Sequence, residues 1–108
     1  MNTLKTTIES AWDDRTTIST STTGAVRDAV DQILRELDSG TRRIAVKSAT
    51  GWSVEEWLKK AVLLSFRLNP NAKMEGNAWD KVPLKTSNWS PLDFNEAGFR
   101  AVPGSIVR

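Results

Sequence analysis

The chain has 108 residues, enough for one domain whose core needs no disulfide or structural metal. It has no cysteine and no histidine, which excludes disulfides, thiolate metal ligands and catalytic pairs built on a cysteine or an imidazole. Its 15 basic and 13 acidic residues give a net charge of +2, too small to indicate nucleic-acid binding by itself. Because there is no apolar run of about 18 residues and no signal-peptide core, we expect a cytoplasmic protein with no membrane partner.

Two amphipathic helices are predicted before residue 40. Over residues 3–15, apolar side chains recur every three or four positions and form a single stripe, which is typical of a helix. Over residues 23–38, a second stripe runs from Val26 to Leu37, with charged side chains on the opposite face. Gly40 follows at the position where a left-handed residue commonly ends a helix.

A short β ribbon is predicted next. Residues 42–48 alternate between apolar and polar side chains, a period that favours a strand. After a turn at 49–51, residues 52–54 can return as a second strand. Because a two-stranded ribbon is only marginally stable alone, we expect it to pack beside the helices.

The third helix, over residues 54–68, is expected to organise the fold. After Lys60 it is apolar on nearly every face, which predicts that it is the most buried helix of the domain. Its start reads as a capping box, Ser53-Val54-Glu55-Glu56, in which the first and last side chains bond each other's backbone N–H. Asn69-Pro70 predicts its end, because proline disfavours helix in the residue before it.

Residues 69–90 are predicted to form a long loop rich in proline and tryptophan. An irregular stretch of this length inside a compact domain is usually functional or covers a partner. We expect Trp79 and Trp89 to pin this loop, and Trp12, Trp52 and Trp57 to lie in the core.

A short helix and an extended segment are predicted to close the chain. Ser90-Pro91-Leu92-Asp93 combines an N-cap serine, a proline at the first helical position and an acidic third residue, and Gly98 predicts the helix end. Residues 99–102 and 105–108 are predicted to be extended, on either side of Pro103-Gly104. The chain stops on an apolar segment, which is typical of a cut edge.

With these segments in order, the chain resembles the N-terminal region of the tetrahydrodipicolinate N-succinyltransferase family. The resemblance covers essentially the whole chain at consistent spacing. It is carried by Ile8–Arg15, Trp57–Leu68, Trp79-Asp80-Lys81-Val82-Pro83, Gly98-Phe99-Arg100-Ala101-Val102-Pro103 and Ile106-Val107-Arg108.

This resemblance implies a mainly helical α+β fold with a short β ribbon, followed in the family by a left-handed parallel β-helix. The chain would then comprise a helical domain over residues 1–98 and an extended segment over 99–108 that leads toward the β-helix, whose hexapeptide repeats the sequence lacks. The implied activity is transfer of succinyl from succinyl-CoA to the amino group of 2-amino-6-oxopimelate, in lysine and diaminopimelate synthesis. The family is homotrimeric. No cofactor is implied, because succinyl-CoA is a co-substrate.

Arg100 is the candidate substrate-binding residue. The resemblance implies this role, because Gly98-Phe99-Arg100 matches the family segment whose arginine binds the substrate. The chemistry agrees, because a guanidinium grips a carboxylate with two parallel hydrogen bonds and the acceptor is a dicarboxylate. No catalytic, cofactor-binding or metal-binding residue is assigned. The CoA contacts and the acidic active-site residue are expected beyond Arg108, so we expect these 108 residues alone to be inactive.

Two other readings stay open. A helical domain of this family could serve as a non-catalytic interaction module, or as a separate subunit beside a β-helix chain. Trp79 and Trp89 near Lys81 and Lys85 also suggest single-stranded nucleic acid, which is bound by stacking beside basic groups. The second reading is weaker, because there is no nucleic-acid motif and little net charge, so no nucleic-acid partner is expected. A local contact between Asp80 and Lys81 is the default expectation for that pair.

Overall fold

The computed structural model describes residues 3–108, which form two compact units that divide after Pro70. The first unit contains, in order, α1 (Thr3–Asp13), the single-turn 3-10 helix η1 (Arg15–Thr17), α2 (Ala25–Ser39), β1 (Ala45–Ser48), β2 (Gly51–Val54) and α3 (Glu56–Leu68). The second contains β3 (Ala72–Lys73), β4 (Trp79–Asp80) and α4 (Pro91–Ala97). The described chain is mainly helical with small antiparallel strand pairs, as expected for the fold class.

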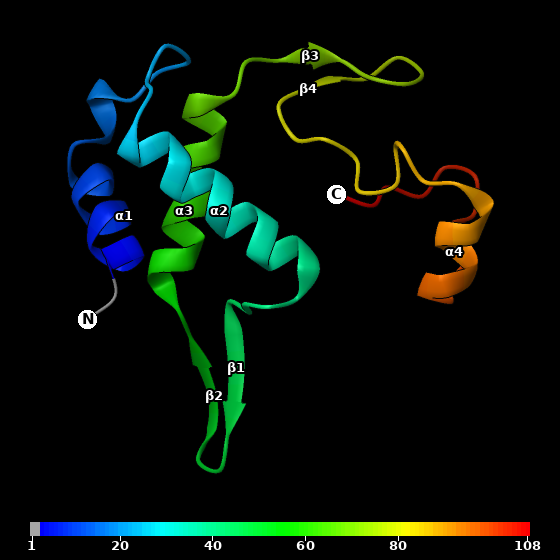
Figure 1. The fold of residues 1–108 in the computed structure, drawn as a ribbon, viewed down its shortest axis with the longest axis horizontal. Coiled ribbons are helices and arrows are strands. Elements are labelled where there is room, and N and C mark those ends of the chain that lie inside the picture. Colours follow the sequence, from blue (N-terminus) through cyan, green and yellow to red (C-terminus); the bar gives the residue numbers. More distant parts are fainter. Residues whose placement is uncertain (1–2) are drawn as a thin grey trace. The chain divides into compact units, whose positions relative to one another are not determined.

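The core of the first unit lies where α1, α2 and α3 pack against one another (Figure 1). Ile8 of α1, Ile33 of α2 and Leu64 of α3 are all fully buried. Helix α3 provides more buried residues than either of its neighbours, so the prediction that it is the most buried helix is confirmed.

Helix α3 nevertheless keeps an exposed face, although its sequence after Lys60 is apolar on nearly every side. Leu63 and Phe66 are 47% and 36% exposed. They lie on the side turned away from the core, because Leu64 and Leu68 take the inward positions. Two packed neighbours cover one stripe of a helix, and the apolar character of the remaining face does not by itself bury it.

The start of α3 also differs from the prediction. Ser53 belongs to β2, and the N-cap position is occupied by Glu55, which makes no side-chain capping bond. The Ser53 Oγ donates instead to the Val46 carbonyl, at 3.4 Å. The hairpin therefore includes Ser53, the residue that the capping box needs as its N-cap. Strand pairing determines the structure here, although the local sequence favours a helix start.

Strands β1 and β2 form an antiparallel hairpin in which Ala45 faces Val54 and Lys47 faces Trp52. The prediction that this ribbon packs beside the helices is wrong: it extends away from them (Figure 1), and every residue of β1 is exposed. Only its base is attached, since Ile44 packs against the core and its carbonyl accepts from the Glu55 N–H at 2.7 Å. Trp52 is 70% exposed, so its predicted place in the core is also wrong.

The ends of α1 and α2 are set by local bonds. Helix α1 ends at Asp13, two residues before the prediction, and the Arg15 guanidinium turns back to the Trp12 carbonyl at 2.8 Å. Helix α2 ends as predicted at Gly40, whose φ of 83° is the left-handed conformation that glycine adopts without steric cost.

Arg27, on α2, fastens the 19–24 loop to the end of α3. Its guanidinium donates to the carbonyls of Thr20 and Thr22, and also to the carbonyl of Leu68 at 2.9 Å. The sequence pattern places Arg27 on the charged face of its helix, and it does not predict that the guanidinium binds these three carbonyls.

The second unit has no buried residue. Strands β3 and β4 pair Ala72 with Asp80 and Lys73 with Trp79, so part of the predicted loop forms a small ribbon. The Asp80 carboxylate accepts a hydrogen bond from the Arg108 guanidinium at 2.7 Å. A local contact between Asp80 and Lys81 was expected from the sequence, and the contact with Arg108 was not predicted. Trp79 is 67% exposed, so its predicted role in pinning the loop is wrong.

Helix α4 begins and ends where the sequence predicts. Ser90 and Asp93 form the capping box, and Gly98 ends the helix with a φ of 75°. Residues 99–102 and 105–108 form no strand, and the Val107 carbonyl accepts from the Lys85 N–H at 2.9 Å. The predicted boundary after residue 98 separates the helical domain from a segment that leads toward a β-helix. Because that β-helix is not in this chain, the boundary stays a prediction.

Candidate functional site

Arg100 lies on the segment that leaves α4, two residues beyond the Gly98 cap. Its side chain is exposed, and it makes no hydrogen bond or ion pair with any residue of the described range 3–108. The guanidinium is therefore available to a ligand, since no internal carboxylate competes for its donors.

An aromatic cluster fixes the segment that carries Arg100. Trp89 lies before α4, Phe94 lies on it and Phe99 follows it, with ring centroids 5.1 to 6.0 Å apart in tilted and edge-on arrangements. Such pairs stabilise a local structure beyond simple burial. The backbone of Arg100 thus follows directly on an anchored residue, while its side chain stays in solvent. Trp89, which was expected to pin the 69–90 loop, anchors the end of that loop on Phe94 and Phe99.

The chemistry open to Arg100 is recognition of an anion. A guanidinium presents paired N–H donors in a planar fork that matches the two oxygens of a carboxylate. The guanidinium offers hydrogen-bond donors and no acceptor atom, so it can bind and orient an anion. The described part of the chain offers no histidine or cysteine beside it.

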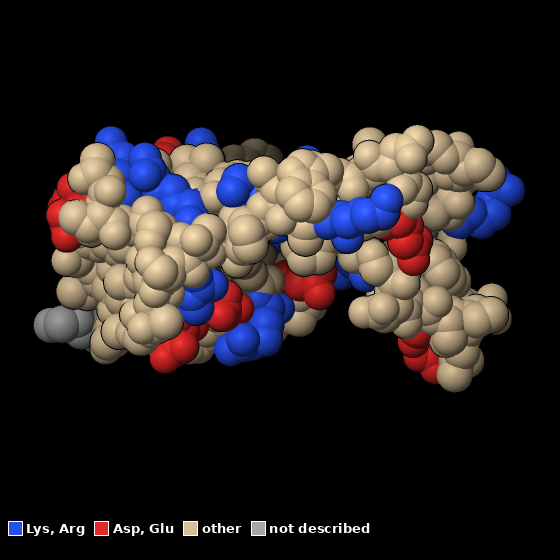
Figure 2. Space-filling view, turned by 90° about the horizontal axis from the view of Figure 1, so that it is seen from above, with Lys and Arg blue, Asp and Glu red and all other residues tan. Residues whose placement is uncertain are grey.

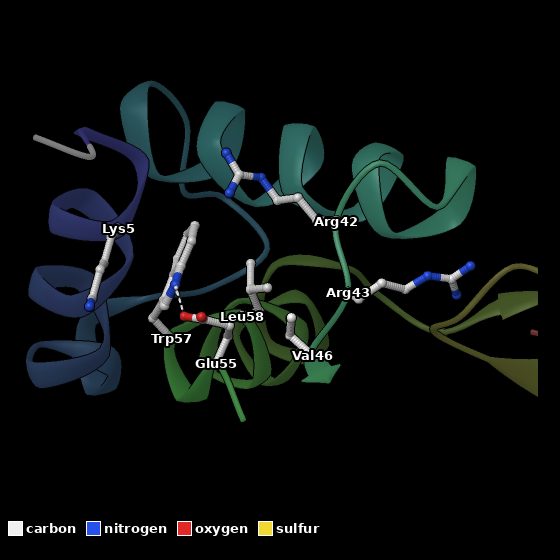
Figure 3. Close-up of a pocket in the computed structure, with 7 residues that line it drawn as sticks. All are labelled: Lys5, Arg42, Arg43, Val46, Glu55, Trp57 and Leu58. Atoms are coloured by element: carbon white, nitrogen blue, oxygen red, sulfur yellow. Dashed lines mark hydrogen bonds between the residues drawn. The ribbon is translucent and has the colours of Figure 1, made fainter. Parts of the chain in front are cut away.

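A second candidate is a pocket of about 390 Å³ in the first unit (Figure 3). It is lined by Lys5 of α1, by residues around the hairpin base and by the start of α3, namely Arg42, Arg43, Val46, Glu55, Trp57 and Leu58. Three of these side chains are basic and one is acidic, so the charge of the lining favours an anion.

The contacts inside this pocket favour a structural role. The Arg42 guanidinium lies 5.3 Å from the centre of the Trp57 ring, and its Nε donates to the Glu36 carboxylate at 2.8 Å. The Trp57 indole N–H donates to the Glu55 carboxylate at 3.2 Å. Figure 3 shows the Arg43 guanidinium pointing away from the indole. The polar groups around Trp57 are therefore engaged with one another, and the basic groups do not converge on one point.

The surface charges do not form a single-sign face in the view of Figure 2, where Lys and Arg alternate with Asp and Glu. Among residues 3–108, no three acidic side chains come close enough together to hold a metal ion. In the same range, no helix has the length and apolar content needed to cross a membrane.

Comparison with known proteins gives one consistent result. The family model described as the tetrahydrodipicolinate N-succinyltransferase N-terminal domain matches residues 3–68. A relative from Methylorubrum extorquens (strain PA1), named 2,3,4,5-tetrahydropyridine-2,6-dicarboxylate N-succinyltransferase, is 57% identical over 110 residues, covering 97% of this chain and 39% of its own.

Relatives with the same name show the same pattern. The one from Gluconobacter oxydans is 56% identical and is covered over 40% of its length, and the one from Bradyrhizobium diazoefficiens is 54% identical and is covered over 41%. These matches include 97% and 100% of the present chain. The chain therefore spans about two fifths of the length of the curated relatives it matches.

Proposed function

Because the chain belongs to the tetrahydrodipicolinate N-succinyltransferase family, we propose that it is the N-terminal domain of an enzyme that succinylates 2-amino-6-oxopimelate, the ring-opened form of tetrahydrodipicolinate. The succinyl donor is succinyl-CoA, and the pathway is lysine and diaminopimelate synthesis. The observation that carries the proposal is 57% identity to a named succinyltransferase across 97% of the chain. We further propose a homotrimeric, cytoplasmic enzyme, as the resemblance implies, with no cofactor.

The proposed reaction is an acyl transfer. The acceptor amine attacks the thioester carbonyl carbon of succinyl-CoA, a C–N bond forms, the C–S bond breaks, and the amine proton ends on the CoA thiol. The chain has no histidine or cysteine to assist that proton transfer. We propose that the proton-transfer groups and the CoA groove belong to the remaining part of the full-length enzyme.

In this proposal, Arg100 orients the acceptor. Its exposed, unpaired guanidinium suits a carboxylate of the substrate, and binding that carboxylate would hold the amine in line with the thioester. Such a residue contributes through position and charge, without exchanging a proton.

The test compares the 108-residue chain with the same chain joined to the C-terminal part of the Methylorubrum extorquens relative. Thiol release from succinyl-CoA is measured with and without the acceptor. We expect no turnover from the short chain and acceptor-dependent turnover from the joined chain. Turnover by the short chain would show that it holds the CoA site itself. A joined chain that is folded and trimeric but inactive would favour the interaction module.

A further inference from the structure

The hairpin of β1 and β2 is the least covered regular element of the first unit. Trp52, Val54 and Val46 are 70%, 51% and 42% exposed, and they lie on strands that extend away from the helices (Figure 1). A two-stranded hairpin is marginally stable in water unless another surface covers it. Large apolar side chains that are exposed next to one another are a candidate interaction surface.

The strand register divides these residues between two faces. Because side chains alternate along a strand and Ala45 pairs with Val54, one face carries Ala45, Lys47, Trp52 and Val54, which we call the hairpin face. Val46 lies on the other face and lines the pocket beside Trp57. The hairpin face thus presents a continuous apolar strip, with Lys47 directly opposite Trp52.

Lys47 is the one charged residue of the two hairpin strands, and it lies on the hairpin face. At the base of the hairpin, Arg42 is paired with Glu36, and Arg43 adds a further positive charge. A complementary surface would be apolar at its centre, to cover Trp52 and Val54, and acidic at its rim. A second copy of the same hairpin does not satisfy this condition, because pairing two hairpin faces would bring like charges together.

The relatives suggest where such a surface lies. Three fifths of each relative has no counterpart in this chain, and the family model that matches is its N-terminal domain. We propose that the hairpin face docks on the C-terminal part of the full-length protein, at an apolar surface rimmed by acidic side chains. This docking depends on the presence of the longer chain but not on its catalytic activity, so it can fail or hold independently of the proposed succinyl transfer.

The first test uses the 108-residue chain alone. Trp52→Ser is compared with Trp79→Ser, a matched control at an equally exposed tryptophan of the second unit. Because nothing covers Trp52 in this chain, both variants are expected to unfold within about 0.3 M of the parent urea midpoint. A large loss of stability for Trp52→Ser alone would show that this chain already covers the hairpin, and the proposal would be wrong.

The second test measures amide hydrogen exchange across the hairpin. In the chain joined to the C-terminal part of the Methylorubrum extorquens relative, exchange at residues 45–54 should be at least ~100-fold slower than in the 108-residue chain. Amides of α3 are the control, because the core around Leu64 is buried in both. If the α3 control shows that the joined chain is not folded, the full-length relative takes its place, with the matching segment as the readout.

Reversing the charge of Lys47 tests whether the surface that covers the hairpin face is acidic at its rim. Lys47→Glu should remove most of the added protection in the joined chain, whereas Lys73→Glu, at an exposed lysine of β3, should not. Equal exchange in the short and joined chains would overturn the proposal. So would protection that grows with the concentration of the short chain, which would identify a second copy as the occupant. If the hydrogen-exchange protection is unchanged in the Lys47→Glu variant, the proposal that acidic side chains rim the docking surface is wrong.

Discussion

The guanidinium of Arg27 donates to the carbonyl of Leu68 at 2.9 Å, across 41 positions of sequence. Leu68 is the last residue of α3, and its carbonyl is one of the groups that a helix end leaves without an intrahelical partner. The same guanidinium also holds the carbonyls of Thr20 and Thr22. The Arg27 side chain therefore connects the 19–24 loop and the end of α3 to helix α2.

Replacing Arg27 with methionine should lower the free energy of unfolding by about 1–3 kcal/mol, because the part-buried carbonyls it serves would lose a charged donor. Arg35→Met, at an exposed position of the same helix, is the control and should change stability by less than about 0.5 kcal/mol. Urea unfolding followed by circular dichroism measures both. Equal effects at the two positions would show that the Leu68 bond contributes nothing specific.

Leu64→Ala should cost about 2–5 kcal/mol, because Leu64 is fully buried between helices and its truncation leaves a cavity. Leu63→Ala, at the neighbouring position that is 47% exposed, should cost less than about 1 kcal/mol. Urea melts of the two variants give the comparison directly. A loss below about 1 kcal/mol for Leu64→Ala would contradict the packing of α3 described above.

The ion pair between Lys60 on α3 and Glu9 on α1, at 2.9 Å, should contribute little. Its side chains are 27% and 38% exposed, so solvent screens the attraction. A double-mutant cycle with Lys60→Met and Glu9→Gln should give a coupling energy of about 0.3–1 kcal/mol in low salt. The coupling should decrease in 1 M salt. A coupling that salt leaves unchanged would mean that the two groups are held by packing and not by charge.

Arg100→Lys should behave as a damaging change in the joined, active chain, because it keeps the charge but loses the planar fork. We expect kcat/KM for the amino acceptor to decrease by on the order of tenfold to a thousandfold, about 1.4–4 kcal/mol of transition-state stabilisation. The KM for succinyl-CoA should change much less. Arg35→Lys serves as the control. If Arg100→Ala changes only the KM for succinyl-CoA, Arg100 does not bind the acceptor.

Local signals in the sequence predicted those parts of the fold that local chemistry decides. The capping box of Ser90 and Asp93 and the left-handed ends at Gly40 and Gly98 all occur where expected, because each is satisfied within a few residues. The capping box at Ser53 failed because the same residues also read as a strand. The hairpin pairing, which involves Val46 seven positions away, decided between the two structures.

Burial was harder to predict than element type. The sequence does not show which apolar face packs against a neighbour, so Trp52 was expected in the core and is exposed. Leu63 and Phe66 of the apolar helix α3 are exposed for the same reason. At the candidate site, too, the local structure could be predicted but the contacts of the side chain could not. The position of Arg100 after a helix end follows from Gly98, but its lack of an internal partner is known only from the structure. The contact between Asp80 and Arg108 has no sequence signal, because it joins residues 28 positions apart.

The late position of α3 in the chain has a consequence for synthesis on the ribosome. Helices α1 and α2 are translated first, but Ile8 and Ile33 reach full burial only in a core that α3 completes. At about 5–20 residues per second, the 29 residues from the end of α2 at Ser39 to the end of α3 at Leu68 take roughly 1.5–6 s to translate. During that interval the nascent chain exposes two apolar helix faces, and transiently exposed apolar surface of this kind favours aggregation.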